Sequence, residues 1–203
     1  MSTALFSTHD LLKASVQPEP GADPMTPRAQ AAPVLPAMYL LSKGRKELRL
    51  HVGELQADRM VHYATGGRWS AHELLQFVLE RTGPAQVSIS TWTVTENPVR
   101  SLLALRSVGL ITELQLLFDH RIKTRSPQGF QLVAALDARV GFAKCHAKVT
   151  VVENTQWAVT ILSSQNYTRN PRIEAGVIFT DRPSANFHRS WMQRQIENEQ
   201  PFI

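Results

Sequence analysis

A histidine and a lysine separated by one residue, His146 and Lys148, open an apolar run that is typical of a β-strand. Alternate side chains of a strand point to the same face, so both groups should lie in one site while Ala147 points away. A second pair with the same spacing, Ser164 and Asn166, follows at the expected end of the next strand. These pairs bring together an imidazole, a cation and neutral hydrogen-bond donors.

These residue types suit the cleavage of a phosphodiester without a metal ion. The negative charge on the phosphodiester repels nucleophiles, and the Lys148 ammonium would neutralise it. His146 would attack phosphorus through a neutral ring nitrogen to give a phosphohistidine. A second imidazole would protonate the leaving oxygen and then activate water. Ser164 and Asn166 would donate to the phosphate oxygens, and Glu174 would hold the other histidine nitrogen and fix its tautomer.

Residues 146 to 174, HAKVTVVENTQWAVTILSSQNYTRNPRIE, resemble the motif of the phospholipase D superfamily. That family shares His-x-Lys-x4-Asp, then a strand, then Gly-Ser-x-Asn with Thr, Asn and Glu behind it. The matching residues here are His146, Lys148, Ser164, Asn166, Thr168, Asn170 and Glu174. The likeness covers Gln86 to Asp181 and implies the same catalytic roles. It also implies an α/β fold, a phospholipase D-like three-layer α-β-α sandwich with a mixed central sheet and one catalytic motif per chain.

Two positions depart from the family pattern. Glu153 stands where the family has Asp; it keeps the charge and adds a methylene, so it stays among the predicted catalytic residues. Ser163 stands where the family usually has Gly, and adds a side chain where the backbone approach is close. Residues behind the second pair would contact the substrate, and these are Thr168, Arg169, Asn170 and Arg172.

The chain carries this motif once, without an internal repeat. The resemblance to single-motif family members implies that the second His, Lys and Asn come from another copy across a two-fold axis, in a homodimer. An in-chain alternative is His120, which follows Asp119 at a predicted strand end, where α/β proteins place ligands. The competing interpretation of His120 is a solvated loop histidine. No His and Cys residues have metal-ligand spacing, so neither a metal nor a cofactor is expected.

The elements that position these residues follow from hydrophobic periodicity. A capping box at Ser70 to Glu73 predicts a helix that ends at Gly83-Pro84. A strand, a helix and a strand follow, and their right-handed crossover makes the two strands parallel. The pattern of Met38 to Leu55 predicts a hairpin that turns at Ser42 to Gly44. Beyond Asp119 the sequence predicts a loop, a short helix running into a strand, three strands and a closing helix, over residues 120–129, 129–140, 146–153, 157–164, 174–180 and 184–200.

Composition separates a lead-in from a folded domain. Residues 13 to 36 hold six of the twelve prolines, and we predict a flexible proline-rich N-terminal segment over 1–37. Residues 38–203 would form the phospholipase D-like catalytic domain, with its motif core at 86–181. The single cysteine, Cys145, excludes an internal disulfide and fits a reducing compartment. The first residues lack the pattern of a secretory signal, so the predicted location is cytoplasmic.

Three classes of function compete. The favoured one is a nuclease that hydrolyses DNA or RNA, because the small single-motif family members that this chain resembles are more similar to nucleases than to lipases. The net charge of +5 and the pI near 9.7 also bias the surface toward polyanions. A lipid-directed phospholipase or phosphatidyl transferase is the second class, but no obvious apolar interfacial helix supports stable membrane association. The third is a catalytically inactive module that binds nucleic acid.

Overall fold

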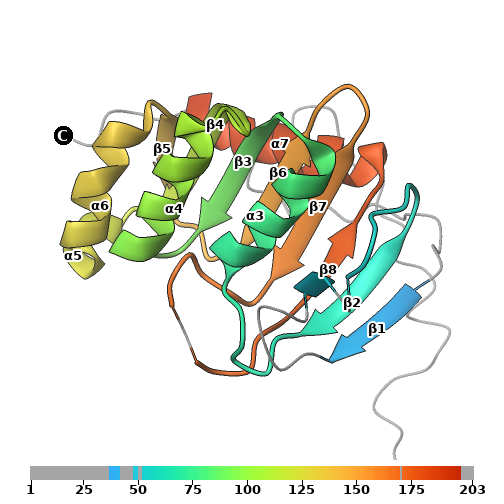
Figure 1. Ribbon diagram of the computed structural model, residues 1–203. Coiled ribbons are helices and arrows are strands. Elements are labelled where there is room, and N and C mark those ends of the chain that lie inside the picture. Colours follow the sequence, from blue (N-terminus) through green and yellow to red (C-terminus); the bar gives the residue numbers. More distant parts are fainter. Residues whose placement is uncertain (1–36, 42–47, 50–51, 170, 198–203) are drawn as a thin grey trace, which may run out of the picture. The chain divides into compact units, whose positions relative to one another are not determined.

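The computed structural model describes residues 37–41, 48–49, 52–169 and 171–197. Its strands are β1 (Ala37–Leu41), β2 (Met60–Ala64), β3 (Ala85–Thr91), β4 (Ile111–Asp119), β5 (Arg139–Ala143), β6 (Val149–Glu153), β7 (Ala158–Ser163) and β8 (Ala175–Phe179). In the described residues these strands form an eight-stranded sheet in the order β1-β2-β8-β7-β6-β3-β4-β5 (Figure 1). β3, β4 and β5 are parallel, whereas β6 and β8 run antiparallel to both of their neighbours. The sheet is therefore mixed.

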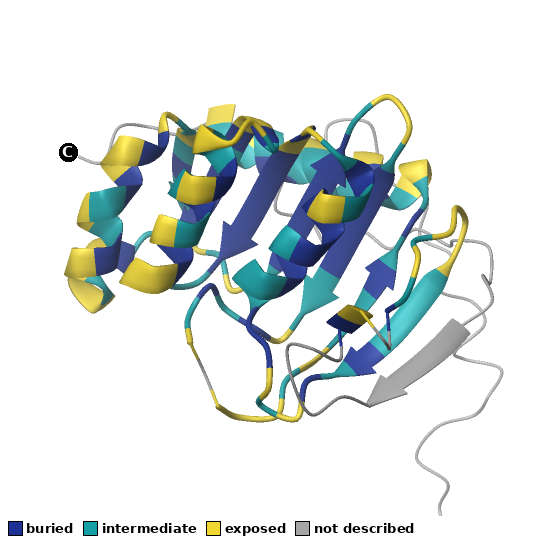
Figure 2. Cartoon of the chain, in the orientation of Figure 1, coloured by how far each residue is buried: buried dark blue, intermediate teal, exposed yellow. Residues whose placement is uncertain are grey.

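Helices cover both faces of this sheet. They are α3 (Ala71–Thr82), α4 (Glu96–Ser107), α5 (Ile122–Arg125), α6 (Pro127–Val133) and α7 (Arg182–Glu197), with a 3-10 turn at Ala134–Leu136. Val152 on β6 joins the core beneath α3 and α4, whereas Val149 and Val151 pack with Met192 of α7. This alternation places a core on each side of the strands, which are buried while the outer sides of the helices are exposed (Figure 2). The predicted three-layer α-β-α sandwich with a mixed sheet is confirmed.

The helix that begins after Ser70 shows how local sequence produces this architecture. The Ser70 backbone N–H donates to the Glu73 carboxylate at 2.9 Å, as the predicted capping box requires. The helix ends at Gly83, whose φ of 74° lies in the left-handed region that favours glycine. Leu75 and Val78 are fully buried on its inner face. The predicted strand-helix-strand unit is also present, as β3, α4 and β4, with parallel strands.

The hairpin predicted over 38–55 is wrong where the structure describes it. β1 pairs in parallel with β2, and Leu48 and Arg49 are helical. Two neighbouring antiparallel strands can be joined by a short turn, but the parallel β1–β2 pair needs a longer connection. Of the predicted lead-in, residues 1–36 lie outside the described residues, and Ala37 begins β1.

One edge of the sheet collects most of the motif. We call it the motif edge, defined by the strand ends at Thr91, Asp119, Val149, Ser163 and Ala175. β3, β4 and β7 end there, and β6 and β8 begin there, as the pairing registers require. None of the helices in the described part of the chain has both the length and the apolar character that crossing a bilayer requires.

Candidate active site

His146 and Lys148 lie in the short segment that leads into β6, just outside the strand that the sequence predicted for them. Their side chains nevertheless meet: Lys148 Nζ lies 3.1 Å from His146 Nδ1, and it donates to the His146 carbonyl oxygen at 2.7 Å. His146 is exposed and Lys148 is partly buried. An imidazole and an ammonium are therefore presented together to solvent at the motif edge.

Partial burial changes the pKa of Lys148. Partial desolvation lowers the pKa of its ammonium from the ordinary value of 10.5, and the charges of Cys145 and Glu174 oppose that shift. The influence of Glu174 shows that the two halves of the predicted motif lie within electrostatic reach of each other. In its protonated form the Lys148 ammonium can neutralise an anionic group.

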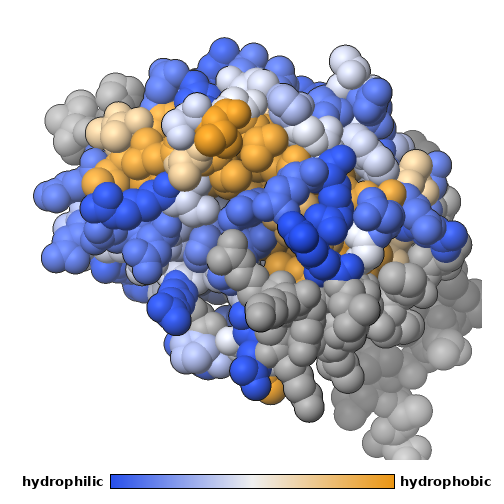
Figure 3. Space-filling view, in the orientation of Figure 1, coloured by the Kyte–Doolittle hydropathy of each residue, from blue (hydrophilic) through white to orange (hydrophobic). Residues whose placement is uncertain are grey.

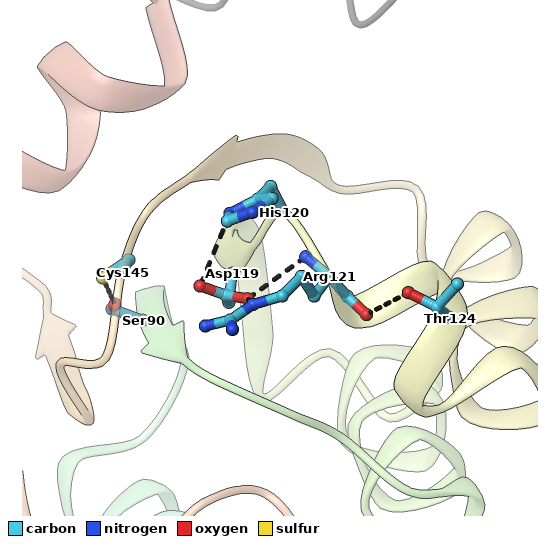
Figure 4. A network of polar contacts seen from close by, with 6 residues as sticks. All are labelled: Ser90, Asp119, His120, Arg121, Thr124 and Cys145. Atoms are coloured by element: carbon cyan, nitrogen blue, oxygen red, sulfur yellow. Dashed lines mark hydrogen bonds and ion pairs between the residues drawn. The ribbon is translucent and has the colours of Figure 1, made fainter.

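The segment before β6 crosses the ends of β3 and β4, because β5 lies beside β4 and β6 beside β3. Ser90, at the end of β3, holds this crossing: its hydroxyl donates to the Ala147 carbonyl oxygen at 3.2 Å and lies 3.2 Å from Cys145 Sγ (Figure 4). Ser90 is fully buried. These contacts hold the Cys145 side chain and the Ala147 backbone, on the two sides of His146.

Asp119 and His120 lie beneath the same crossing, at the end of β4. Asp119 accepts hydrogen bonds from the Arg121 backbone at 3.1 Å and the Arg121 side chain at 2.9 Å (Figure 4). Burial raises the pKa of the Asp119 carboxyl, but these bonds and the Arg121 charge outweigh it and leave the pKa below its ordinary value. His120 donates its backbone N–H to Ala143, and its Nδ1 lies 3.6 Å from the Asp119 carboxylate.

Ser164 and Glu174 are joined directly. The Ser164 hydroxyl donates to the Glu174 carboxylate and accepts the Ala175 backbone N–H at 3.1 Å. The Glu174 backbone is bonded in turn to Thr65, since Glu174 N–H donates to the Thr65 hydroxyl at 3.1 Å and its carbonyl accepts Thr65 N–H at 2.8 Å. The loop between β7 and β8 is thereby attached to the residue that follows β2. Sequence reasoning did not identify Thr65.

Asn166 is oriented by the end of β3. Its side-chain oxygen accepts the Trp92 backbone N–H at 3.2 Å and the Thr91 hydroxyl at 3.3 Å. The amide nitrogen has no partner among the described residues, so this –NH2 group is the part of Asn166 that can donate to a ligand. This arrangement suits the predicted role of Asn166 as a donor.

Trp92 is a site residue that the sequence analysis missed. Its ring meets the His146 ring edge-on, with centroids 5.3 Å apart and planes at 62°. The Arg125 guanidinium lies over the Trp92 ring, 3.9 Å from its centroid. Trp92 therefore separates His146 from a cation and limits the orientations of the imidazole. Its position directly after β3 was the available signal, because ligand-contacting residues of α/β proteins gather at such strand ends.

The two departures from the family pattern have different surroundings. Ser163 is accommodated, since its hydroxyl accepts the Gln165 backbone N–H at 2.9 Å and shapes the turn that carries Ser164. Glu153 is not brought to the motif edge: it ends β6, five residues from Lys148, or roughly 16 Å along an extended chain. It pairs with Arg189 of α7 at 2.8 Å.

The predicted substrate contacts lie on the loop between β7 and β8. Thr168 donates its backbone N–H to the Asn166 carbonyl at 2.8 Å, while Arg169 and Arg172 are exposed on the loop between β7 and β8. Asn170 lies outside the described residues. In the described part of the chain, no three His, Cys, Asp or Glu side chains gather in a way that could hold a metal ion.

The sheet order and the two helical layers define a phospholipase D-like α/β fold. Solved structures with this fold include Nuc, a phospholipase D family member from Salmonella typhimurium, with a TM-score of 0.55 and 15% identity over 70% of this chain and 95% of that chain. Polyphosphate kinase from Porphyromonas gingivalis matches with a TM-score of 0.52 and 11% identity, over 71% of this chain and 27% of the kinase. Neither protein-family models nor curated sequences give a match. At these identities the structural likeness establishes the fold, and the activity is inferred from the residues of the site.

Proposed function

We propose that this protein is a metal-independent phosphodiesterase of the phospholipase D type that hydrolyses nucleic acid in a homodimeric site. The observation that carries the proposal is the gathering of motif residues at one sheet edge. His146 contacts Lys148, Ser164 contacts Glu174, and the Asn166 amide is oriented with its –NH2 group available. These groups supply a nucleophile, a cation and neutral donors, which are the parts that attack on a phosphodiester needs.

The reaction has two displacements. A neutral nitrogen of His146 bonds to phosphorus while the bond to the leaving oxygen breaks, and an imidazolium on the second histidine gives that oxygen its proton. The neutral second imidazole then takes a proton from water, and the resulting hydroxide displaces His146 from phosphorus. Lys148 and the Asn166 –NH2 group stabilise the phosphate oxygens throughout, and Ser164 joins them by turning its hydroxyl from Glu174 to the phosphate. In a homodimer the second imidazole is the partner subunit's His146.

The charge at the motif edge supports nucleic acid as the substrate. Exposed basic residues follow the strand ends there: Arg68, Arg121, Lys123, Arg125, Lys144, Arg169 and Arg172. The carboxylate of Asp119 is already paired with Arg121, and that of Glu174 accepts the Ser164 hydroxyl. A surface with unbalanced positive charge attracts a phosphate backbone without reading its sequence.

The decisive experiment is cleavage of labelled single- and double-stranded DNA and RNA in the presence of EDTA. We expect wild-type protein to cleave, and His146→Ala and Lys148→Ala to lose cleavage. Phosphatidylcholine vesicles are the parallel substrate, and headgroup release there with intact nucleic acid would favour the lipid-directed class. Binding of nucleic acid by wild type with no cleavage of any substrate would favour the inactive module.

Two further variants locate the second imidazole. His120→Asn should retain cleavage if the partner subunit supplies it, and should lose cleavage if His120 does. In the second experiment an equal amount of His146→Ala chain is added to wild type and the chains are allowed to exchange. About a quarter of the dimers, in twice the number of dimers, would then be fully wild type. Total activity should therefore fall to about half of its starting value if each site needs two intact chains. Unchanged activity after verified exchange would contradict a shared site.

A further inference from the structure

A hollow of about 550 Å3 lies beside the motif, at the N-terminal ends of α3 and α4. Its lining comes from the turn after β2, the first turns of both helices and the loop between β7 and β8. The lining includes Arg68, Trp69, Ser70, Glu73, Asn97 and Arg169. On this face of the molecule, hydrophilic residues surround the N-terminal end of α4, whereas apolar residues gather farther along that helix (Figure 3). The hollow is a polar site of nucleotide size.

The charge of the hollow favours an anion. Arg68 and Arg169 are exposed, and neither guanidinium has a carboxylate partner among the described residues. Glu73 is the single acid in the lining, and its carboxylate is occupied by the Ser70 backbone N–H at 2.9 Å. Asn97 adds an exposed amide in the first turn of α4. Two helix N-termini add the positive ends of their dipoles.

The wall of the hollow contains a buried tryptophan whose backbone is hydrogen-bonded to the loop between β7 and β8. Trp69 is 2% exposed, and its indole N–H is buried with no hydrogen-bond partner among the described residues. The Trp69 carbonyl oxygen accepts a hydrogen bond at 2.8 Å from Gln165, which is buried between Ser164 and Asn166. The same turn of chain therefore carries motif residues and holds the wall of the hollow.

We infer that this hollow binds a second phosphate of the substrate strand, one or more nucleotides from the bond that is cleaved, through Arg68 and Arg169. This inference rests on the proposed function, because it assigns the hollow to the same polynucleotide. The buried Trp69 ring offers no face for stacking, so the contact is to phosphate and is independent of base identity. A strand held at two phosphates is aligned for attack at one of them.

The test separates the hollow from the reaction centre. Arg68→Gln, Arg169→Gln and the double variant are compared with Arg59→Gln, which removes an exposed arginine just before β2, at the opposite edge of the sheet. Each is assayed on bis(p-nitrophenyl) phosphate, which has a single phosphate, and on a 12-nucleotide single strand. We expect kcat/KM on the strand to fall about tenfold per arginine, and kcat/KM on the single-phosphate substrate to fall much less. Arg59→Gln should leave both substrates unchanged.

Binding gives an independent readout. In a His146→Ala background, fluorescence anisotropy with the labelled strand should show weaker binding for each arginine variant, and the salt dependence of log Kd should lose about 0.7 in slope per arginine. Inorganic tripolyphosphate should compete poorly with the strand, whereas equal competition would assign the hollow to free polyphosphate and overturn the inference. Equal losses on both substrates, or variants that match Arg59→Gln, would also overturn it. If the proposed function is wrong, wild-type protein will cleave neither substrate, but the arginine variants will still bind the strand more weakly than Arg59→Gln. That outcome is distinguishable from failure of the inference about the hollow.

Discussion

Gly67 joins the turn after β2 to the loop that carries the second half of the motif, and it allows a quantitative test of that junction. Its φ is +73°, and a Cβ added there would lie 2.0 Å from the Pro171 carbonyl oxygen and 2.7 Å from the carbonyl carbon. Gly109 is a matched control, because its φ is +76° and an added Cβ would meet nothing within 4 Å. Gly109→Ala therefore measures the left-handed backbone alone, at roughly 1–2 kcal/mol.

Gly67→Ala adds a clash to the same backbone penalty. The Pro171 backbone must move by about 1 Å, which costs about 1–3 kcal/mol beyond the control. Urea unfolding followed by circular dichroism should place the Gly67→Ala midpoint about 0.5–1.5 M below that of Gly109→Ala. Cleavage by the folded protein should also fall for Gly67→Ala alone, because Pro171 shares a loop with Glu174. Equal midpoints for the two variants would refute this account of the junction.

Other predictions follow from charges. Lys148→Arg should move the alkaline limb of kcat/KM to higher pH, since burial lowers the pKa of Lys148 and a guanidinium stays charged; an unmoved limb would exclude Lys148 as its origin. Asp119 has a lowered pKa because its bonds and charge contact with Arg121 outweigh burial, so it stabilises the fold above the unfolded pKa of about 3.9 and loses this effect as pH falls through the folded value. Asp119→Asn should therefore lower the free energy of unfolding at pH 7 by about 1–3 kcal/mol and flatten its acid dependence, measured by urea titration from pH 2 to pH 7. Glu153→Gln breaks the pair with Arg189 and should lower stability by about 1 kcal/mol while kcat is retained; loss of kcat at unchanged stability would return Glu153 to the catalytic set.

Elements with strong local signals could be predicted from the sequence. The helix after Ser70 has a capping box, an apolar face and a glycine stop, and each of these acts within a few residues. The hairpin of β6 and β7 is similarly local, because Asn154 closes it: the Asn154 side-chain oxygen accepts the Gln156 and Trp157 backbone N–H groups at 2.9 and 2.8 Å. Such features need no knowledge of the rest of the chain.

Features set by distant pairing could not be predicted in the same way. β2 spans five residues, Met60–Ala64, and contains His62, so its apolar pattern is weak. It is a strand because β8 pairs with it on one side and β1 on the other. The position of His146 and Lys148 before β6 has a similar cause: β6 pairs with β3 from Val149 onward, and β3 ends at Thr91. Trp92 then turns toward His146, a contact between residues 54 positions apart.

Glu153 and Lys148 lie at opposite ends of β6, so their side chains have different surroundings. β6 carries Lys148 just before its first residue and Glu153 at its last, so a single strand connects the motif edge with the opposite edge. At the opposite edge the Glu153 carboxylate pairs with Arg189 on α7, the helix that covers the second face of the sheet. The extra methylene of Glu, compared with Asp, extends the reach of the carboxylate toward that helix. The Glu153 carboxylate therefore fixes the end of β6 against α7, away from the motif edge.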